Sequence, residues 1–155
     1  MFLSILSGGG GEDAVLRAMF AARKRVFVDL LKWDVPVLAG QYEVDQFDDE
    51  HATYLILTDH QGAHLGSARL LETERPVPRG QGVREITRFC PDPDQHARQR
   101  RITRDTLVTA LAEFGLATGL ERYTGVAEVG GLKPIPPFRP RAPAGAGVGL
   151  HHPSP

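Results

Sequence analysis

The spacing of apolar residues changes period along the chain, and the order of these periods limits the fold more than any other feature. Alternating apolar residues predict a strand, whereas apolar residues at intervals of three and four predict a helix. Strands are predicted at Phe2–Leu6, Thr53–Thr58, His64–Leu71, Arg84–Phe89 and Arg122–Val129. Helices are predicted from Asp13, the expected N-cap, to Leu31 and from about Arg98 to Gly119. This order predicts an α/β (α+β) layer arrangement, with helices packed on a mostly antiparallel sheet.

The composition divides the chain into one domain and a tail. Residues 1–129 carry the periodic pattern and are enough for a single hydrophobic core. Residues 130–155 contain seven prolines and five glycines and almost no periodic apolar pattern. Such a composition buries too little apolar surface to offset the entropy lost on ordering the chain. We therefore expect a domain over residues 1–129 and a disordered or loosely packed tail over residues 130–155.

Charge and hydropathy argue against several classes of protein. The chain has 18 Lys and Arg residues against 19 Asp and Glu residues, without the basic excess of a nucleic-acid binder. No apolar run approaches the roughly 18 residues that span a bilayer. The first residues lack a basic region before their apolar stretch, so they make a poor signal peptide. The single cysteine, Cys90, allows no internal disulfide. We expect a cytoplasmic protein that binds no nucleic acid.

Charged and aromatic residues recur inside or beside the predicted helices, strands and turns. They are Arg23, Phe27, Trp33, Glu43, Asp45, Asp48, Arg69, Glu85 and Arg88. Arginines and carboxylates are rarely buried unless paired, so a fold that gathers them would make a site for a small zwitterion. Taken singly, the aromatic residues could be core, and Arg69 with Glu85 could be a structural ion pair. The acidic run lacks the glycine and closing glutamate of a calcium loop, so no metal site is expected.

The same residues fall in four segments whose combined spacing is specific. These are Arg23-Lys-Arg-Val-Phe27 with Lys32-Trp33-Asp34-Val35, Glu43-Val-Asp45-Gln-Phe47-Asp48, Gly66-Ser-Ala-Arg69-Leu-Leu and Arg84-Glu85-Ile-Thr-Arg88-Phe89. Over residues 1–129 the chain resembles the acyl-homoserine-lactone (autoinducer) synthases. The resemblance implies an N-acetyltransferase-like fold and production of a quorum-sensing signal. An acyl chain would pass from acyl carrier protein to the amine of S-adenosylmethionine, whose carboxylate then closes the lactone and expels methylthioadenosine. S-adenosylmethionine is then a substrate, and no cofactor is expected.

The resemblance also implies roles for the site residues. Binding of S-adenosylmethionine is assigned to Arg23, Phe27, Trp33, Asp45 and Asp48. In these roles the guanidinium pairs with the substrate carboxylate, the aromatic faces meet the adenine or sulfonium, and the aspartates hold the ammonium.

Catalysis is assigned to Glu43, Glu85, Arg69 and Arg88, and the resemblance favours the last three as a charged network beneath the ligand. Either glutamate is a candidate to accept the amine proton. Since residues three apart on a strand point to opposite faces, Glu85 and Arg88 share a face only if a bulge lies between them. Backbone N–H groups of such a bulged or splayed strand would stabilise the oxyanion.

A basic cluster at the start of the second predicted helix suggests how the acyl donor is recognised. The cluster consists of Arg98, Arg100, Arg101 and Arg104. Acyl carrier proteins are acidic, so these arginines are candidates to steer and dock one; a solvated helix face is the alternative. The preceding stretch, Pro91–Arg98, contains no glycine, unlike the loops with which coenzyme A-dependent acetyltransferases hold a pyrophosphate.

Two departures from the family pattern leave the alternatives open. Glu72–Val83 is a short connection without the phenylalanine that family members place at the substrate site, and the tail replaces the helix and strands that complete the acyl pocket. The fold is thus expected to be shortened and altered at its C-terminus. One alternative is a degenerate, non-catalytic relic that binds S-adenosylmethionine or carrier protein. A second is an ordinary coenzyme A-dependent N-acetyltransferase.

Overall fold

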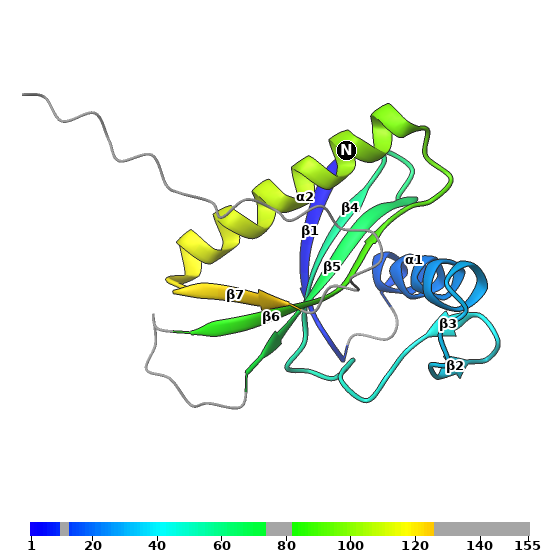
Figure 1. Ribbon diagram of the computed structural model, residues 1–155, viewed down its shortest axis with the longest axis horizontal. Helices are drawn as coiled ribbons and strands as arrows, with labels where there is room; N and C mark the ends of the chain where they lie inside the picture. Colours follow the sequence, from blue (N-terminus) through cyan, green and yellow to red (C-terminus); the bar gives the residue numbers. More distant parts are fainter. Residues whose placement is uncertain (10–12, 74–81, 126–155) are drawn as a thin grey trace, which may run out of the picture.

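The computed structural model describes residues 1–9, 13–73 and 82–125. In chain order the elements are β1 (Phe2–Ser7), α1 (Ala14–Arg23), η1 (Lys24–Leu30), β2 (Val37–Leu38), β3 (Tyr42–Glu43), β4 (Thr53–Thr58), β5 (His64–Glu72), β6 (Val83–Pro91), α2 (Ala97–Thr118) and β7 (Arg122–Gly125). One sheet has the strand order β1-β4-β5-β6-β7 (Figure 1). Neighbouring strands run antiparallel except β6 and β7, which run parallel. The predicted α+β fold is confirmed.

Helices cover both faces of the sheet because successive residues of the interior strand β4 point to opposite sides. On β4, Leu55 and Leu57 pack in a core cluster with Leu107 and Leu111 of α2. The alternate residues of β4 pack in a second cluster with residues of α1. The sheet is therefore the middle of three layers, as Figure 1 shows.

The ends of the two helices follow from local sequence. The Asp13 carboxylate accepts hydrogen bonds from the backbone N–H groups of Val15 and Leu16, which confirms it as the N-cap of α1. His96 caps the start of α2, and Gly119, with a φ of 69°, ends it in the left-handed conformation. The start and end predicted for the second helix are thus confirmed to within one or two residues.

The first predicted helix is two segments with different winding. It is α-helical to Arg23 and continues as the π-helical segment η1, and the backbone N–H of Leu31 bonds to the carbonyl of Val26. π-Helical turns are rare and are often found at functional sites. Apolar spacing alone does not distinguish the two windings, so the prediction was a single helix.

A short hairpin interrupts the segment that was predicted to be irregular, Trp33–Phe47. Strands β2 and β3 pair over two residues each, and Ala39 and Gly40 between them have φ values of 50° and 66°. The Gln41 N–H bonds to the Leu38 carbonyl at 3.1 Å, so Ala39 and Gly40 are the central residues of a tight turn within a three-residue loop, and both have positive φ. Strands this short leave no alternating pattern from which they could be predicted.

A bulge in β6 decides which side chains share a face. Ser67 pairs with Cys90 and Arg69 pairs with Thr87, so β6 carries one extra residue opposite Ala68. Arg88 lies in this bulge with a φ of 48°. The condition set by the sequence for Glu85 and Arg88 to share a face is therefore met.

Three predictions concern residues outside or at the edge of the described part. The tail at 130–155 and most of the connection Glu72–Val83 lie outside it, so the domain boundary at 129 remains a prediction. β7 is described to Gly125, inside the strand predicted at Arg122–Val129. Among the described residues, no helix is long and apolar enough to cross a membrane.

Candidate functional site

Six charged side chains from five separate segments meet between the sheet and the α1–η1 segment. The arginines are Arg23, Arg69 and Arg88, and the carboxylates are Glu43, Asp45 and Asp48. Their formal charges cancel, three positive against three negative, which allows a group of this size to be largely buried. We call these six residues the charged network.

Arg23 is enclosed by the network rather than open to a ligand. Its side chain is 1% exposed, its Nε donates to Glu43, and Nη1 and Nη2 donate to the two Asp48 oxygens at 2.7 and 2.9 Å. Burial alone would lower the Arg23 pKa, but the hydrogen bonds to Asp48 and Glu43 raise it above its ordinary value. Arg23 therefore links the helix to β3 and the following loop, and its assignment to the substrate carboxylate stays a prediction.

Asp48 is the junction of the charged network. Its side chain is fully buried and accepts bonds from Arg23, from Arg69 Nη1 at 2.8 Å, from the Asp45 backbone N–H at 2.8 Å and from the Tyr54 hydroxyl at 2.8 Å. Burial acts to raise the Asp48 pKa, but the hydrogen bonds and charge of Arg23 outweigh it and hold the pKa far below its ordinary value. A carboxylate with this many donors holds the loop in place.

Arg69 and Asp45 extend the charged network toward β6. Arg69 Nη1 and Nη2 donate to Asp45 at 2.6 and 3.0 Å, while its Nε donates to Thr87 at 2.9 Å. Asp45 accepts in turn from Arg88 Nη2 at 2.9 Å. Although burial alone would lower it, bonding to Asp45 raises the Arg69 pKa. The structural ion pair considered for Arg69 and Glu85 is not formed, since Arg69 pairs with the aspartates.

Two aromatic side chains, Phe27 and Trp33, lie beside Arg88 at the partly exposed end of the charged network, and we call them the aromatic wall. The rings of Phe27 and Trp33 lie 4.8 Å apart, and the Arg88 guanidinium carbon lies 5.3 and 5.5 Å from their centroids. Arg88 also donates to Glu43 through Nε and Nη2, but its Nη1 bonds to no described residue. Its side chain is 15% exposed. Arg88 is thus the arginine of the network with the most access to a ligand.

Glu85 lies on the same face of the sheet but outside the charged network. It pairs with Leu71, and Arg69, two residues away on β5, pairs with Thr87, so Glu85 and Thr87 point to the same side. The residue is half-buried, and among the described residues it has neither an ion pair nor a hydrogen bond through its side chain. Of the three residues expected to form a network, Arg69 and Arg88 therefore belong to the charged network and Glu85 does not.

Two aromatic residues near the charged network, the buried Tyr54 and the partly buried Phe20, were missed by the sequence analysis. Tyr54 donates to Asp48 from the centre of the sheet, and Phe20 lies under the Arg23 guanidinium at 5.2 Å. The two rings meet edge to face at 5.9 Å. Their apolar neighbours on α1 and β4 gave both residues the pattern of ordinary core, and nothing local marked them as part of a site.

Comparison with known proteins identifies the family. A family model described as autoinducer synthase matches residues 11–78. An acyl-homoserine-lactone synthase of Rhizobium etli is 33% identical over 154 residues, which cover 82% of this chain and 71% of that protein. The chain belongs to the acyl-homoserine-lactone synthase family. A synthase of Ralstonia nicotianae is 34% identical over 102 residues, but this chain spans only 50% of its length.

Solved structures of synthases share the fold. TofI, crystallised in a ternary complex with an inhibitor and MTA, is 26% identical with a TM-score of 0.62, and the match covers 81% of this chain and 71% of TofI. BjaI, a CoA-dependent acyl-homoserine lactone synthase crystallised with SAM and isopentyl-CoA, is 23% identical with a TM-score of 0.67. That match covers 82% of this chain and 66% of BjaI, and at this identity it supports the fold alone.

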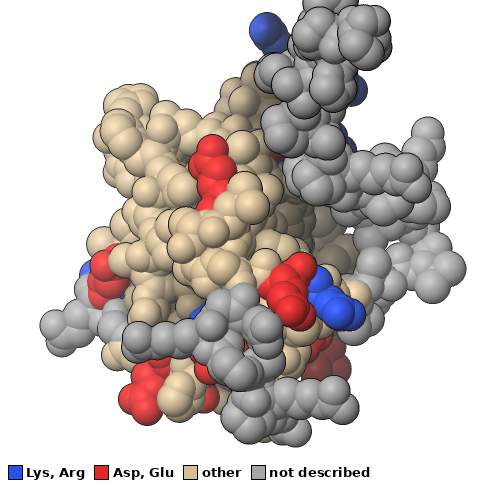
Figure 2. Space-filling model, turned by 90° about the vertical axis from the view of Figure 1, so that its left-hand side faces the viewer, with Lys and Arg blue, Asp and Glu red and all other residues tan. Residues whose placement is uncertain are grey.

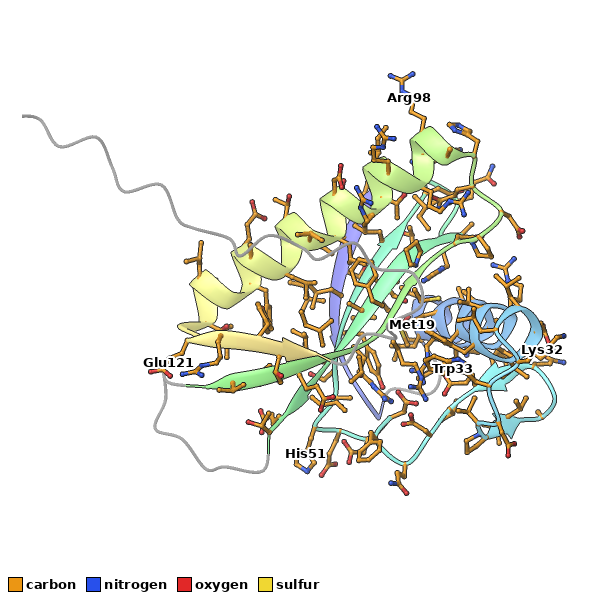
Figure 3. The ribbon with its side chains drawn as sticks, in the orientation of Figure 1. Met19, Lys32, Trp33, His51, Arg98 and Glu121 are labelled. Atoms are coloured by element: carbon orange, nitrogen blue, oxygen red, sulfur yellow. The ribbon has the colours of Figure 1, made fainter. Side chains whose placement is uncertain are left out.

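The basic cluster of this family member lies away from the charged network. Arg98, Arg100, Arg101 and Arg104 are all exposed on the first turns of α2, and Arg104 pairs with its neighbour Asp105. Figure 3 shows Arg98 projecting outward and well apart from Trp33. The face shown in Figure 2 is mostly uncharged in its described part, with scattered acidic and basic side chains. The arginines are exposed to solvent, and their role in docking a partner stays a prediction.

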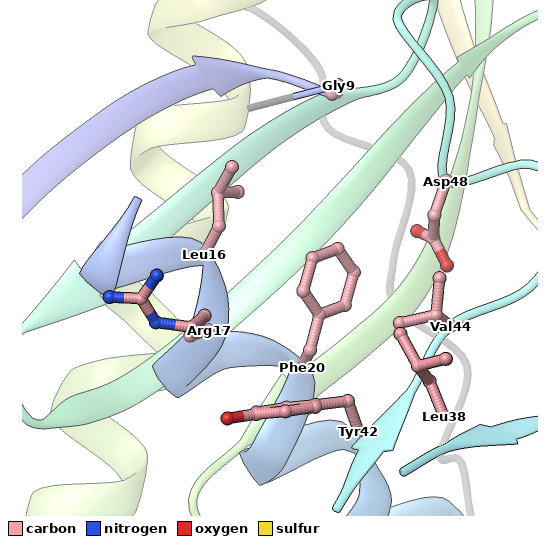
Figure 4. Close-up of a pocket in the computed structure, with 9 residues that line it drawn as sticks. Gly9, Leu16, Arg17, Phe20, Leu38, Tyr42, Val44 and Asp48 are labelled. Atoms are coloured by element: carbon pink, nitrogen blue, oxygen red, sulfur yellow. The ribbon is translucent and has the colours of Figure 1, made fainter. Parts of the chain in front are cut away.

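A cavity of about 280 Å³ lies between α1, the end of β1 and the β2–β3 hairpin (Figure 4). It is lined by Gly8, Gly9, Leu16, Arg17, Phe20, Leu38, Tyr42, Val44 and Asp48. It touches the charged network through Asp48 but includes neither Arg88 nor the aromatic wall. The surface around Arg88, Trp33 and Glu85 is therefore the candidate substrate site among the described residues, and its role stays a prediction.

Metal ligands and reactive thiols are not grouped in the described part of the chain. Among the described residues, no three His, Cys, Asp or Glu side chains converge as a metal site. The acidic run at Glu43–Asp48 is instead neutralised by arginines. Burial raises the pKa of Cys90 to about 12, so its thiol stays protonated.

Proposed function

We propose that this chain transfers an acyl group from acyl carrier protein to the α-amine of S-adenosylmethionine and releases an acyl-homoserine lactone. The amine attacks the thioester carbonyl, and the carrier thiolate leaves with a proton. The methionyl carboxylate then attacks its own γ-carbon, which closes the lactone and expels methylthioadenosine. Membership of the synthase family supports this reaction class. For this chain, the proposal rests on the partly exposed Arg88 beside the Phe27 and Trp33 rings, with Glu85 unengaged on the same face.

Arg88, rather than Arg23, is the better partner for the substrate carboxylate. Arg23 is 1% exposed and faces two protein carboxylates, whereas Arg88 is 15% exposed and has Nη1 uncommitted toward described residues. A guanidinium binds a carboxylate through charge-assisted hydrogen bonds. The adjacent Phe27 and Trp33 rings offer the faces that a sulfonium or adenine would meet. Arg23 then acts from behind, by fixing the positions of Glu43 and Asp48.

Glu85, rather than Glu43, is the better base. The amine must lose a proton before it attacks, so the catalytic base must be a carboxylate that is free to accept that proton. Glu43 is fully buried and bonded to Arg23 and Arg88, so protonation would leave two guanidinium groups without their shared partner. Glu85 has no such commitment to the described residues. Backbone N–H groups at the Arg88 bulge are suited to stabilise the oxyanion that forms when the amine attacks the thioester carbonyl.

The decisive experiment is reconstitution with defined substrates. Purified chain, S-adenosylmethionine and acyl carrier protein loaded with a series of acyl groups should yield a lactone and methylthioadenosine in equal amounts, both measured by mass spectrometry. Binding of S-adenosylmethionine in a calorimeter without any product would instead support the non-catalytic relic. Acetylation of small amines by acetyl-coenzyme A alone would support the ordinary acetyltransferase.

The acyl donor is tested separately because BjaI, a structural neighbour, is CoA-dependent. With Arg100→Glu and Arg104→Glu together, KM for acyl carrier protein should rise roughly tenfold at low salt and its salt dependence should flatten. The kcat should not change. Arg122→Glu, an exposed reversal at the start of β7, is the matched control. Equal kinetics for both variants, or faster turnover of acyl-coenzyme A than of acyl carrier protein, would contradict docking at this cluster.

A further inference from the structure

Tyr54 connects the rigid centre of the sheet to the charged network. It lies on β4, which pairs with β1 on one side and β5 on the other, and it is completely buried. Its ring packs edge to face against Phe20. Its hydroxyl donates to Asp48 Oδ1 at 2.8 Å. Of the three side chains that donate to Asp48, Tyr54 has the fewest rotatable bonds, and the packing of its buried ring holds its hydroxyl in place.

A continuous series of bonds runs from this hydroxyl to the exposed end of the site. Asp48 Oδ1 also accepts from Arg69 Nη1 at 2.8 Å, and the same Nη1 donates to Asp45 at 2.6 Å. The other Asp45 oxygen accepts from Arg88 Nη2 at 2.9 Å. Each carboxylate in the series accepts from several donors, so a rotation of Asp48 changes the geometry offered to Arg69 and, through Asp45, to Arg88.

We infer that Tyr54 is a positioning residue, which sets the place of Arg88 under the aromatic wall by holding Asp48. Its hydroxyl bonds to Asp48 rather than to Arg88, so its effect on Arg88 passes through the charged network. The kinetic part of this inference rests on the proposed function. The structural part does not, because it concerns the position of Arg88 with or without substrate.

A single tryptophan makes the structural part measurable. Trp33 is the only tryptophan in the chain, and the Arg88 guanidinium lies over its ring at 5.5 Å. Its emission and its quenching by acrylamide therefore depend on the placement of Arg88. No substrate is needed for this measurement.

Tyr54→Phe and Tyr123→Phe form a matched pair. Both remove one hydroxyl and keep the ring; the Tyr123 hydroxyl donates to the Leu111 carbonyl at 2.7 Å, away from the charged network. For Tyr54→Phe we expect altered Trp33 quenching and about a tenfold lower kcat with little change in KM for S-adenosylmethionine, the order expected for losing a hydrogen bond to a charged group. For Tyr123→Phe we expect wild-type quenching and kcat.

The outcomes separate this inference from the proposed function. Wild-type quenching in Tyr54→Phe overturns the inference, as does an equal change in Tyr123→Phe. Altered quenching with an unchanged kcat in an active enzyme also overturns the positioning role. If the wild-type chain makes no lactone, the proposed function fails, and the quenching comparison alone then decides whether Tyr54 places Arg88.

Discussion

His64 should make the folded protein lose stability between pH 7 and pH 5. The residue is 6% exposed, its Nε2 lies 2.9 Å from the Ser67 hydroxyl, and its Nδ1 bonds to no described residue. Burial lowers the His64 pKa from 6.5 to about 4, since the opposing charge of Asp92 is only a partial compensation and Arg25 adds to the decrease. At pH 6.5 the imidazole is therefore half protonated in the unfolded chain but neutral in the folded protein.

The sign and size of the effect follow from these two pKa values. Between pH 6.5 and pH 4 the unfolded chain binds the proton more readily, so stability is highest above this window and falls as the pH decreases through it. Each pH unit inside the window costs about 1.4 kcal/mol for one proton. Lowering the pH from 7 to 5 should then remove about 2 kcal/mol through His64 alone.

Urea unfolding at pH 7 and pH 5 measures this loss. In His64→Gln, which keeps a polar nitrogen near Nε2 but cannot be protonated, the decrease between the two pH values should be smaller than in the wild type by about 2 kcal/mol. His51→Gln is the control, because the side chain of His51 is 73% exposed, and it should behave as the wild type does. If the free energy of unfolding of His64→Gln decreases between pH 7 and pH 5 as much as that of the wild type, the argument is refuted.

Three further substitutions test other parts of the structure. Asp48→Asn should destabilise the fold by about 3–5 kcal/mol, because Arg23 and Arg69 lose a buried counter-charge; urea unfolding measures it, and a loss under 1 kcal/mol would contradict the role of Asp48 as junction. Glu85→Gln should lower the initial rate of lactone formation about 10²–10⁴-fold while leaving the urea midpoint unchanged, and near wild-type turnover would remove Glu85 as the base. Gly8→Ala should prevent stable folding, since a Cβ there would collide with the Asp49 carbonyl; a wild-type melting temperature would show that this loop relaxes easily.

The sequence alone determined features that depend on residues close together in the chain. The Asp13 cap, the strand at Thr53–Thr58 and the ends of α2 all rest on local spacing and capping chemistry. Family membership also depended on sequence, since the charged and aromatic residues occur at specific intervals. These features need only the period of a helix or strand, which a linear pattern records.

The tertiary structure decided how the charged residues are paired and which of them a ligand can reach. Arg23 bonds to Glu43 and Asp48, which are 20 and 25 residues away, and Arg88 bonds to Glu43 across 45 residues. Local sequence patterns also could not locate the bulge at Arg88, the hydrogen bond of the Tyr54 hydroxyl or the unpaired state of the Glu85 carboxylate. Any arginine can pair with any carboxylate in a sequence, and only the packing of the α1–η1 segment, the loop after β3 and the sheet selects the partners. That packing makes Arg23 fully buried and leaves Arg88 partly exposed, although the two are the same residue type.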